Sequence, residues 1–138
     1  MRWVIEGKLT RGRRPDYTGE QPIQVPQGAV DAWISQAHEL GIRSIICLLA
    51  QEQLSLYESL PTDLISYYRD KGFAVAQVPA RDHQKPPLTD TQLEAVWQAY
   101  QELPKPVLVH CSAGIDRTGR AIDHIVGKLQ GPLEHRGG

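Results

Sequence analysis

Residues 107–119 decide the fold of this chain, and they read VLVHCSAGIDRTG. Val107, Leu108 and Val109 are apolar, as expected of a short strand that is buried on both faces of a parallel sheet. A helix is expected from near Arg117, because apolar residues then follow at helical spacing: Ile122, Ile125, Val126 and Leu129. The intervening loop therefore leads from a buried strand to a helix N-terminus, where converging backbone N–H groups make an anion-binding site.

Two further segments, 44–49 and 73–78, are predicted to be strands upstream of this unit. Helices are expected between and around them, at 29–40, at 51–71 with an interruption at Pro61, and from Thr89 to the prolines at 104 and 106. This alternation predicts an α/β fold, with one domain over residues 1–138 and a central, mostly parallel sheet flanked by helices. Ligands of such sheets bind at the carboxyl ends of the strands.

The two ends of the chain are less regular in pattern. Residues 1–10 are predicted to form short strands broken by Gly7, and residues 11–27, rich in Gly, Pro and Arg, to form a loop. A single helix is expected after the 110–117 loop, and Gly131-Pro132 and Gly137-Gly138 predict a frayed tail. The clearest helix start is the capping box of Thr89 and Gln92.

Composition excludes several classes of function. A formal net charge of -1 argues against broad electrostatic capture of nucleic acid or of an anionic membrane. No stretch approaches the roughly 20 apolar residues of a membrane span, and the N-terminus lacks the apolar core of a signal peptide, so the cytoplasm is the expected location. No ligands occur in pairs at metal spacing, and neither a metal nor a cofactor is expected.

The two cysteines differ in their surroundings. Cys47 lies within an apolar run and is predicted to be a small buried hydrophobe, and so few cysteines indicate a reducing compartment. Cys111 lies among polar and small residues in the loop. Converging amides, the helix dipole and Arg117 would all favour its thiolate form. Five residues separate Cys111 from Arg117, so the loop can wrap back and place a guanidinium beside the sulfur. The planar fork of arginine binds two phosphate oxygens at once.

The segment from His110 to Thr118 resembles the His-Cys-x5-Arg-Ser/Thr signature of the cysteine-based protein tyrosine phosphatase superfamily. By its length, the chain is similar to the dual-specificity phosphatases and their small atypical relatives. The resemblance extends over nearly the whole chain, because three other segments also look familial: 7–12, 41–46 and 105–109. The loop between the last strand and the helix would then be the phosphate-binding loop of a phosphatase.

The resemblance implies a reaction in two steps and a role for each residue of the loop. Cys111 would attack phosphorus to form a cysteinyl-phosphate, and Arg117 would bind the phosphoryl oxygens. Thr118 would hydrogen-bond the sulfur when it leaves, and His110 would orient the loop and tune the thiolate. The substrate phosphate would be bound by the loop itself, that is by Ser112, Ala113, Gly114, Ile115, Asp116 and Arg117.

A general acid is needed to expel the leaving group, and Asp82 is the first candidate. It lies in the loop after the 73–78 strand, at the same sheet edge as Cys111, and Arg81-Asp82-His83 resembles the family's acid loop. His83 could donate instead, although a role in shaping the loop is favoured. Asp116 is the second candidate, but a carboxylate beside bound phosphate would repel it, so Asp116 is expected to point outward.

The resemblance implies a phosphoprotein substrate, with hydrolysis of phosphotyrosine and of phosphoserine or phosphothreonine, because the chain is too short for the added loops that deepen the pocket in the tyrosine-only enzymes of the family. The alternative is a non-protein substrate, namely an inositol phosphate, a phospholipid or an RNA 5′ end. Ile115 stands where many lipid-directed relatives carry lysine, which weakens the polyphosphoinositide alternative. A phosphate-binding module without turnover is a third hypothesis, and the oligomeric state stays open.

Arginine and lysine residues near the loop allow two interpretations. They could form a basic rim around the site, or they could be an ordinary solvated face. The residues concerned are Arg11, Arg13, Arg14, Arg81 and Lys85.

Overall fold

The computed structural model describes residues 1–19 and 23–137, with side chains described as far as residue 130. Five strands form one sheet in the order β1-β2-β5-β3-β4. Their bounds are β1 Arg2–Ile5, β2 Leu9–Arg13, β3 Ser44–Cys47, β4 Ala74–Gln77 and β5 Val107–Cys111. The helices are α1 Gln27–Glu39, α2 Gln51–Leu54, the 3₁₀ turn η1 Ser55–Tyr57, α3 Leu64–Asp70, α4 Asp90–Glu102 and α5 Asp116–Gly137.

The sheet is parallel except at one edge, which confirms the predicted α/β class. Only the β1–β2 pair is antiparallel among the five strands of the described residues. The central strand β5 pairs with β2 and with β3, so that Cys111 lies opposite Arg13 and His110 lies opposite Cys47. The carboxyl ends of β5, β3 and β4 consequently meet at one edge, where parallel sheets bind ligands.

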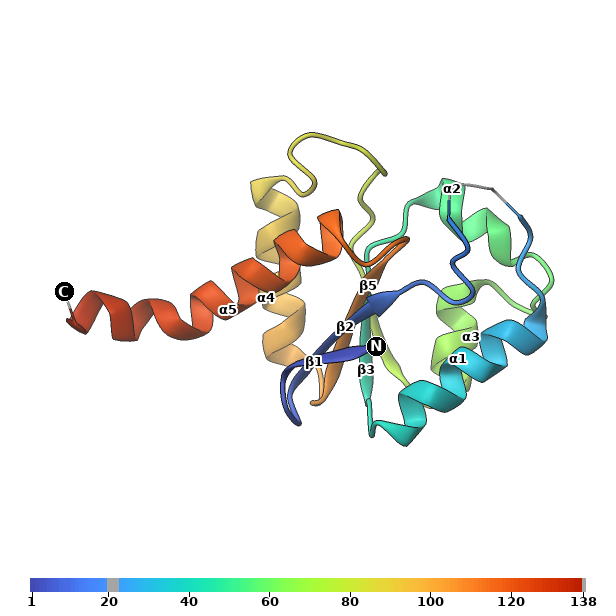
Figure 1. The fold of residues 1–138 in the computed structure, drawn as a ribbon, viewed down its shortest axis with the longest axis horizontal. Helices are drawn as coiled ribbons and strands as arrows, with labels where there is room; N and C mark the ends of the chain where they lie inside the picture. Colours follow the sequence, from blue (N-terminus) through green and yellow to red (C-terminus); the bar gives the residue numbers. More distant parts are fainter. Residues whose placement is uncertain (20–22, 138) are drawn as a thin grey trace.

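Helices cover both faces of the sheet, with α1 and α3 on one side and α4 and α5 on the other (Figure 1). Alternate residues of β3 enter different cores, since successive side chains of a strand point to opposite faces. Ile45 and Cys47 pack in the core under α1 and α3, whereas Ile46 and Leu48 pack in the core under α4 and α5. Every residue of β5 is buried, as predicted for a strand with both faces covered.

Several predicted element bounds need correction. The first loop begins later than expected, because β2 extends through Arg11 to Arg13 by pairing with β5. The helical stretch 51–71 is three separate pieces, and its last piece starts at the N-cap Asp63, whose side chain accepts from the Ser66 backbone N–H. The backbone of α5 continues through Gly131-Pro132 to Gly137, so the prediction of a frayed tail was wrong there, and Gly138 lies outside the described residues.

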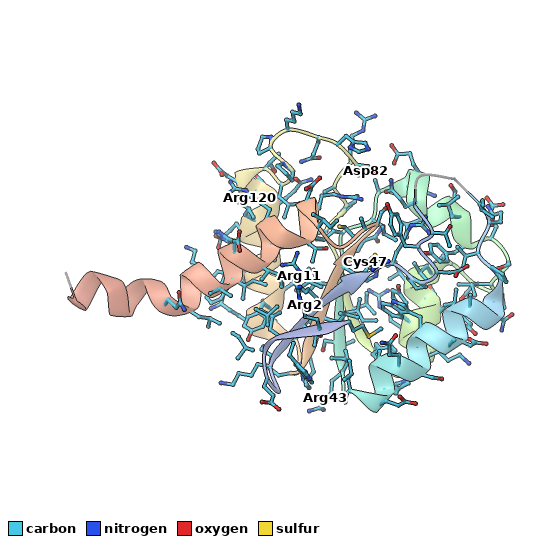
Figure 2. All side chains as sticks on the ribbon, viewed as in Figure 1. Arg2, Arg11, Arg43, Cys47, Asp82 and Arg120 are labelled. Atoms are coloured by element: carbon cyan, nitrogen blue, oxygen red, sulfur yellow. The ribbon has the colours of Figure 1, made fainter. Side chains whose placement is uncertain are left out.

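Other sequence predictions are confirmed in detail. Thr89 and Gln92 form the capping box of α4, with Thr89 Oγ1 accepting from the Gln92 backbone N–H at 3.1 Å. Cys47 is fully buried among the strands in the body of the molecule (Figure 2), and burial raises the pKa of its thiol to about 12. Within residues 1–19 and 23–137, no helix is both long and apolar enough to cross a membrane.

Candidate active site

The loop between β5 and α5 is held from one side by β2 and the residue that follows it. Arg11 Nη2 donates to the Gly114 carbonyl at 3.0 Å, and the Arg14 backbone N–H donates to the Ser112 carbonyl at 3.0 Å. Gly114 has φ +74°, and a Cβ there would lie 2.5 Å from the Gly12 carbonyl oxygen. The loop can therefore approach β2 this closely only because residue 114 has no side chain.

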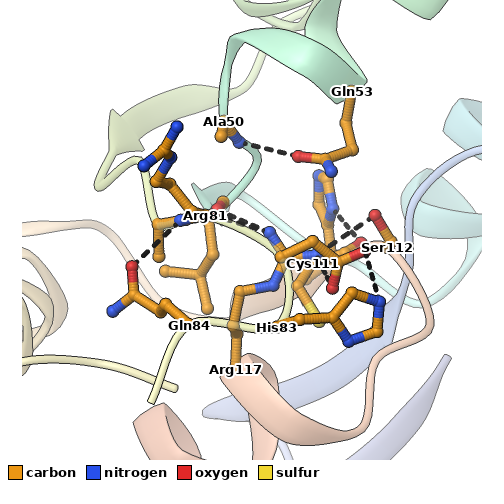
Figure 3. Close-up of polar contacts among 12 residues, drawn as sticks. Ala50, Gln53, Arg81, His83, Gln84, Cys111, Ser112 and Arg117 are labelled. Carbon is orange, nitrogen blue, oxygen red and sulfur yellow. Dashed lines mark hydrogen bonds and ion pairs between the residues drawn. The ribbon is translucent and has the colours of Figure 1, made fainter. Parts of the chain in front are cut away.

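Arg117, in the first turn of α5, makes polar contacts through both of its terminal nitrogens. It is 3% exposed, and its Nη1 donates to the Ala80 carbonyl at 2.8 Å and to the Leu48 carbonyl at 3.5 Å. These carbonyls follow β4 and β3, so the guanidinium ties the ends of two strands to the loop. Nη2 donates to Ser112 Oγ at 3.2 Å, and Figure 3 shows Arg117 beside Cys111, Ser112 and His83.

Asp82 comes from the loop after β4, and its Oδ1 lies 3.4 Å from Arg117 Nη2. Its side chain is 44% exposed, and its Oδ2 lies 3.7 Å from His83 Nε2. The loop is tied to the start of α4, because Gln92 Nε2 donates to the Pro79 carbonyl at 2.9 Å and Gln84 Nε2 donates to Gln92 Oε1 at 2.9 Å. Strand β3 lies between β4 and β5, so Asp82 reaches the site across that strand.

His110 lies beneath the loop, fully buried on the face covered by α1 and α3. Its Nδ1 lies 3.1 Å from the Cys111 carbonyl, and its Nε2 lies 2.9 Å from the Tyr68 hydroxyl. A carbonyl only accepts, so the neutral ring carries its proton on Nδ1 and accepts from Tyr68 on Nε2. Burial, reinforced by the Arg117 and Arg14 charges, lowers the pKa of His110 from 6.5 to about 4.

Thr118 and Asp116 occupy opposite surroundings at the start of α5. The Thr118 hydroxyl is buried and has no hydrogen-bond partner among residues 1–19 and 23–130, so the expected bond to the Cys111 sulfur is not made here. Asp116 is exposed but lines the same cavity as Cys111, so its exposure does not show the expected outward orientation. Ile115 is 65% exposed at the same end of the helix.

One cavity of about 670 Å³ opens at this edge of the sheet, and most of the predicted residues line it. Of the predicted catalytic and phosphate-binding residues, Thr118, His110 and Gly114 lie outside its lining. The predicted residues that line it are Asp82, Cys111, Ser112, Ala113, Ile115, Asp116 and Arg117. Arg14, named from sequence only as part of a possible basic rim, also lines the cavity, as does Tyr17, which sequence reasoning did not single out.

The interpretation of the basic residues as a solvated face was wrong for two of them. Arg11 is half-buried beneath the loop, and Arg14 is only 5% exposed, with its Nη1 donating to the Tyr57 hydroxyl at 3.1 Å. Arg81 is exposed and lies 4.0 Å from Glu52, and Lys85 is also exposed. No sequence spacing links Arg14 to Tyr57, because that contact depends on the packing of η1 against the loop after β2.

Comparisons with known proteins agree with this architecture. A family model described as a DSP-PTPase phosphatase of polymorphic toxin systems matches residues 26–128. The structure of Tk-PTP in its G95A mutant form is similar, with a TM-score of 0.64 and 18% identity over 94% of this chain and 72% of that one. No curated protein sequence matches the chain.

A second similar structure is the core catalytic domain of the PP-IP phosphatase SIW14 from S. cerevisiae, in complex with citrate. Its TM-score is 0.58 at 20% identity, over 94% of this chain and 65% of that one. At these identities the two structures show a shared fold. This chain also spans slightly less than two thirds of the SIW14 core domain.

Proposed function

Because the chain belongs to the DSP-PTPase phosphatase family of polymorphic toxin systems, a family of DSP/PTP-type phosphatases, we propose that it hydrolyses phosphate monoesters with Cys111 as the nucleophile. The observation that carries the proposal is the meeting of three segments at one cavity. Cys111 ends β5, Arg117 begins α5, and Asp82 follows β4, with its carboxylate 3.4 Å from the arginine. Nucleophile, phosphoryl ligand and acid thus share one space.

In the first step, the Cys111 thiolate attacks phosphorus and the bond from phosphorus to the ester oxygen breaks. Asp82, entering protonated, gives its proton to that oxygen, so the leaving group departs as an alcohol. Arg117 lines the cavity, and while Nη1 stays bound to the Ala80 carbonyl, Nη2 exchanges its contacts with Ser112 and Asp82 for phosphoryl oxygens. The phosphoryl group then rests on sulfur.

In the second step, water attacks the cysteinyl-phosphate and gives a proton to the Asp82 carboxylate. The bond from sulfur to phosphorus breaks, and the thiolate is restored with inorganic phosphate as product. The Thr118 hydroxyl is buried without a partner among the described side chains, which leaves its proton free to stabilise the departing sulfur. His110 stays neutral and positions the loop through the Cys111 carbonyl, without touching the substrate.

Phosphorylated tyrosine, serine or threonine side chains of a protein are the first candidate substrates. An open cavity and the exposed Ile115 at its mouth support a substrate that presents apolar surface beyond the phosphate. A non-protein phosphate compound is the second candidate, supported by the fold shared with the PP-IP phosphatase SIW14 and by the buried Arg14 in the cavity lining.

The test is hydrolysis of para-nitrophenyl phosphate by the wild type and by Cys111→Ser, with a chelator present. We expect turnover by the wild type and none by the variant. Cysteinyl-phosphate trapped by acid quench in the wild type would identify the intermediate. Turnover that survives in Cys111→Ser would overturn the mechanism. Phosphate binding by the wild type without any trapped intermediate would instead indicate a binding module.

A further inference from the structure

Arg14 is a second guanidinium in the lining of the cavity that holds Cys111 and Arg117. It is 95% buried, since its exposed fraction is 5%. Its backbone N–H donates to the Ser112 carbonyl at 3.0 Å, so the residue is joined directly to the phosphate-binding loop. Sequence position alone placed it in a surface loop, and the proposed reaction gives it no role.

The guanidinium of Arg14 is held at one nitrogen only. Nη1 donates to the Tyr57 hydroxyl at 3.1 Å, and that hydroxyl donates onward to the Pro15 carbonyl at 2.7 Å. Burial raises the pKa of Tyr57 to about 12, so its hydroxyl keeps its proton and accepts from Arg14 at neutral pH. The ring of Tyr17 lies 5.3 Å from the centre of the guanidinium and supports its plane.

The opposite edge of the same guanidinium has spare donors. Nε is buried without a hydrogen-bond partner, and Nη2 makes no hydrogen bond within residues 1–19 and 23–130. No carboxylate of those residues lies within 4.0 Å of Arg14. A buried cation without an anionic partner is costly, and the Nε–Nη2 edge is the geometry that binds a carboxylate or phosphate in bidentate fashion.

We propose that Arg14 forms a second anion subsite beside the phosphate-binding loop, and that the substrate carries a second anionic group a few bonds from the phosphate that is cleaved. The proposal rests on the proposed function and favours its non-protein alternative. Arg117 and the loop amides take the first phosphate, while the free edge of Arg14 takes the neighbouring phosphate or carboxylate.

The rest of the cavity limits this substrate to a compact one. Glu52, Asp82 and Asp116 also line the cavity, and all three residues are exposed. Their carboxylates would repel a long polyanion that extended past them. The two arginines, in contrast, are both at least 95% buried, so positive charge is concentrated at the bottom of the cavity.

The experiment measures dissociation constants by NMR titration in the Cys111→Ser background, so that no result depends on turnover. Two probes, orthophosphate and ethyl phosphate, carry only one anionic group. Two others carry a second one: pyrophosphate supplies a phosphate, and 2-phosphoglycolate supplies a carboxylate. Arg14→Gln removes the guanidinium and its charge, and Arg14→Lys keeps the charge without the planar guanidinium. The matched control is Arg13→Gln, which removes a neighbouring exposed arginine.

We expect Arg14→Gln and Arg14→Lys to raise the dissociation constant of pyrophosphate, of 2-phosphoglycolate or of both by about tenfold or more. The dissociation constants of orthophosphate and ethyl phosphate should rise by less than about threefold. A selective effect on pyrophosphate assigns the second group as phosphate, and one on 2-phosphoglycolate assigns it as carboxylate. Equal loss on all four probes, loss on none, or the same pattern in Arg13→Gln would overturn the subsite.

Tyr57→Phe keeps the test decisive should the Arg14 variants fail to fold. It retains Arg14 but removes the hydroxyl that accepts from Nη1, so it should raise the dissociation constants of the same doubly anionic probes by about threefold. An unselective or absent effect in a folded Tyr57→Phe protein would then count against the subsite. If the wild type lacked phosphatase activity, these binding constants would still stand, so the two proposals can fail separately.

Discussion

The Asp82 carboxylate lies 3.4 Å from Arg117 Nη2, although one residue follows β4 and the other begins α5. This contact holds the proposed acid over the cavity that contains Cys111. Asp82→Asn removes the proton donor and keeps the shape of the side chain. We expect turnover of an alkyl phosphate to fall by about 10²–10⁴-fold, and turnover of para-nitrophenyl phosphate, whose leaving group needs no proton, by less than about tenfold.

The matched control is His83→Gln, at the neighbouring residue whose Nε2 lies 3.7 Å from Asp82 Oδ2. It should lower both rates by a similar small factor. An equal large loss on both substrates in Asp82→Asn would remove Asp82 as the acid. A loss confined to alkyl phosphates in His83→Gln would transfer the role to His83.

Arg117→Lys tests the need for a planar fork at the start of α5. Lysine cannot bind the Ala80 carbonyl with one nitrogen and phosphoryl oxygens with another, because its charge is on a single atom. We expect kcat to fall by about 10²-fold or more, measured on para-nitrophenyl phosphate. Arg120→Lys, at an exposed residue of the same helix, should keep kcat within about twofold. Nearly full activity in Arg117→Lys would contradict the assigned role.

Gly114→Ala tests the close approach between the loop and β2. Gly41→Ala is its matched control, since both glycines have φ near +75° (+74° and +78°), but no atom lies within 4 Å of a Cβ at Gly41. The control should lower the free energy of unfolding by about 1–2 kcal/mol and leave kcat/KM unchanged. Gly114→Ala should also displace the loop from Gly12 and lower kcat/KM by about 10²-fold or more. Equal kinetics in the two variants would show that the contact is not needed.

The burial of neutral His110 predicts loss of stability in mild acid. Its pKa is about 4 when folded and 6.5 ordinarily, so between these values the unfolded chain binds more protons than the folded one. Stability should therefore fall as pH drops from about 6.5 to 4, by roughly 3 kcal/mol in total. Urea unfolding at intervals across this range measures the slope. His110→Asn should flatten it, and an unchanged slope in that variant would assign the acid sensitivity to other groups.

The two cysteines should differ in their reactivity toward alkylating reagents. Burial raises the pKa of Cys47 to about 12, so its reactive thiolate is absent at neutral pH and forms only when the pH approaches that value. Iodoacetamide at pH 7 should therefore modify Cys111 alone, and mass spectrometry of the digested protein would locate the label. The folded Cys111→Ser variant should remain unlabelled. Faster labelling of Cys47 would show that the core around it opens readily.

Local patterns in the sequence were enough to predict the strand–loop–helix unit and the capped helix α4. Their determinants lie within a few residues of one another: apolar strand residues beside the loop, or Thr89 beside Gln92. The same holds for Cys111 and Arg117, because they stand at the two ends of the single loop between β5 and α5. Asp82 could be placed at the correct sheet edge, since strand direction alone brings that loop there.

Only the tertiary structure decided which distant groups meet. The strand order puts β5 between β2 and β3, and hydrophobic periodicity carries no information about that order. It brings Arg11 to the Gly114 carbonyl, Tyr68 to His110, and Tyr57 to the buried Arg14. An arginine in a polar loop has the sequence pattern of a solvated residue. Arg14 becomes a buried cation because packing against the phosphate-binding loop removes it from water.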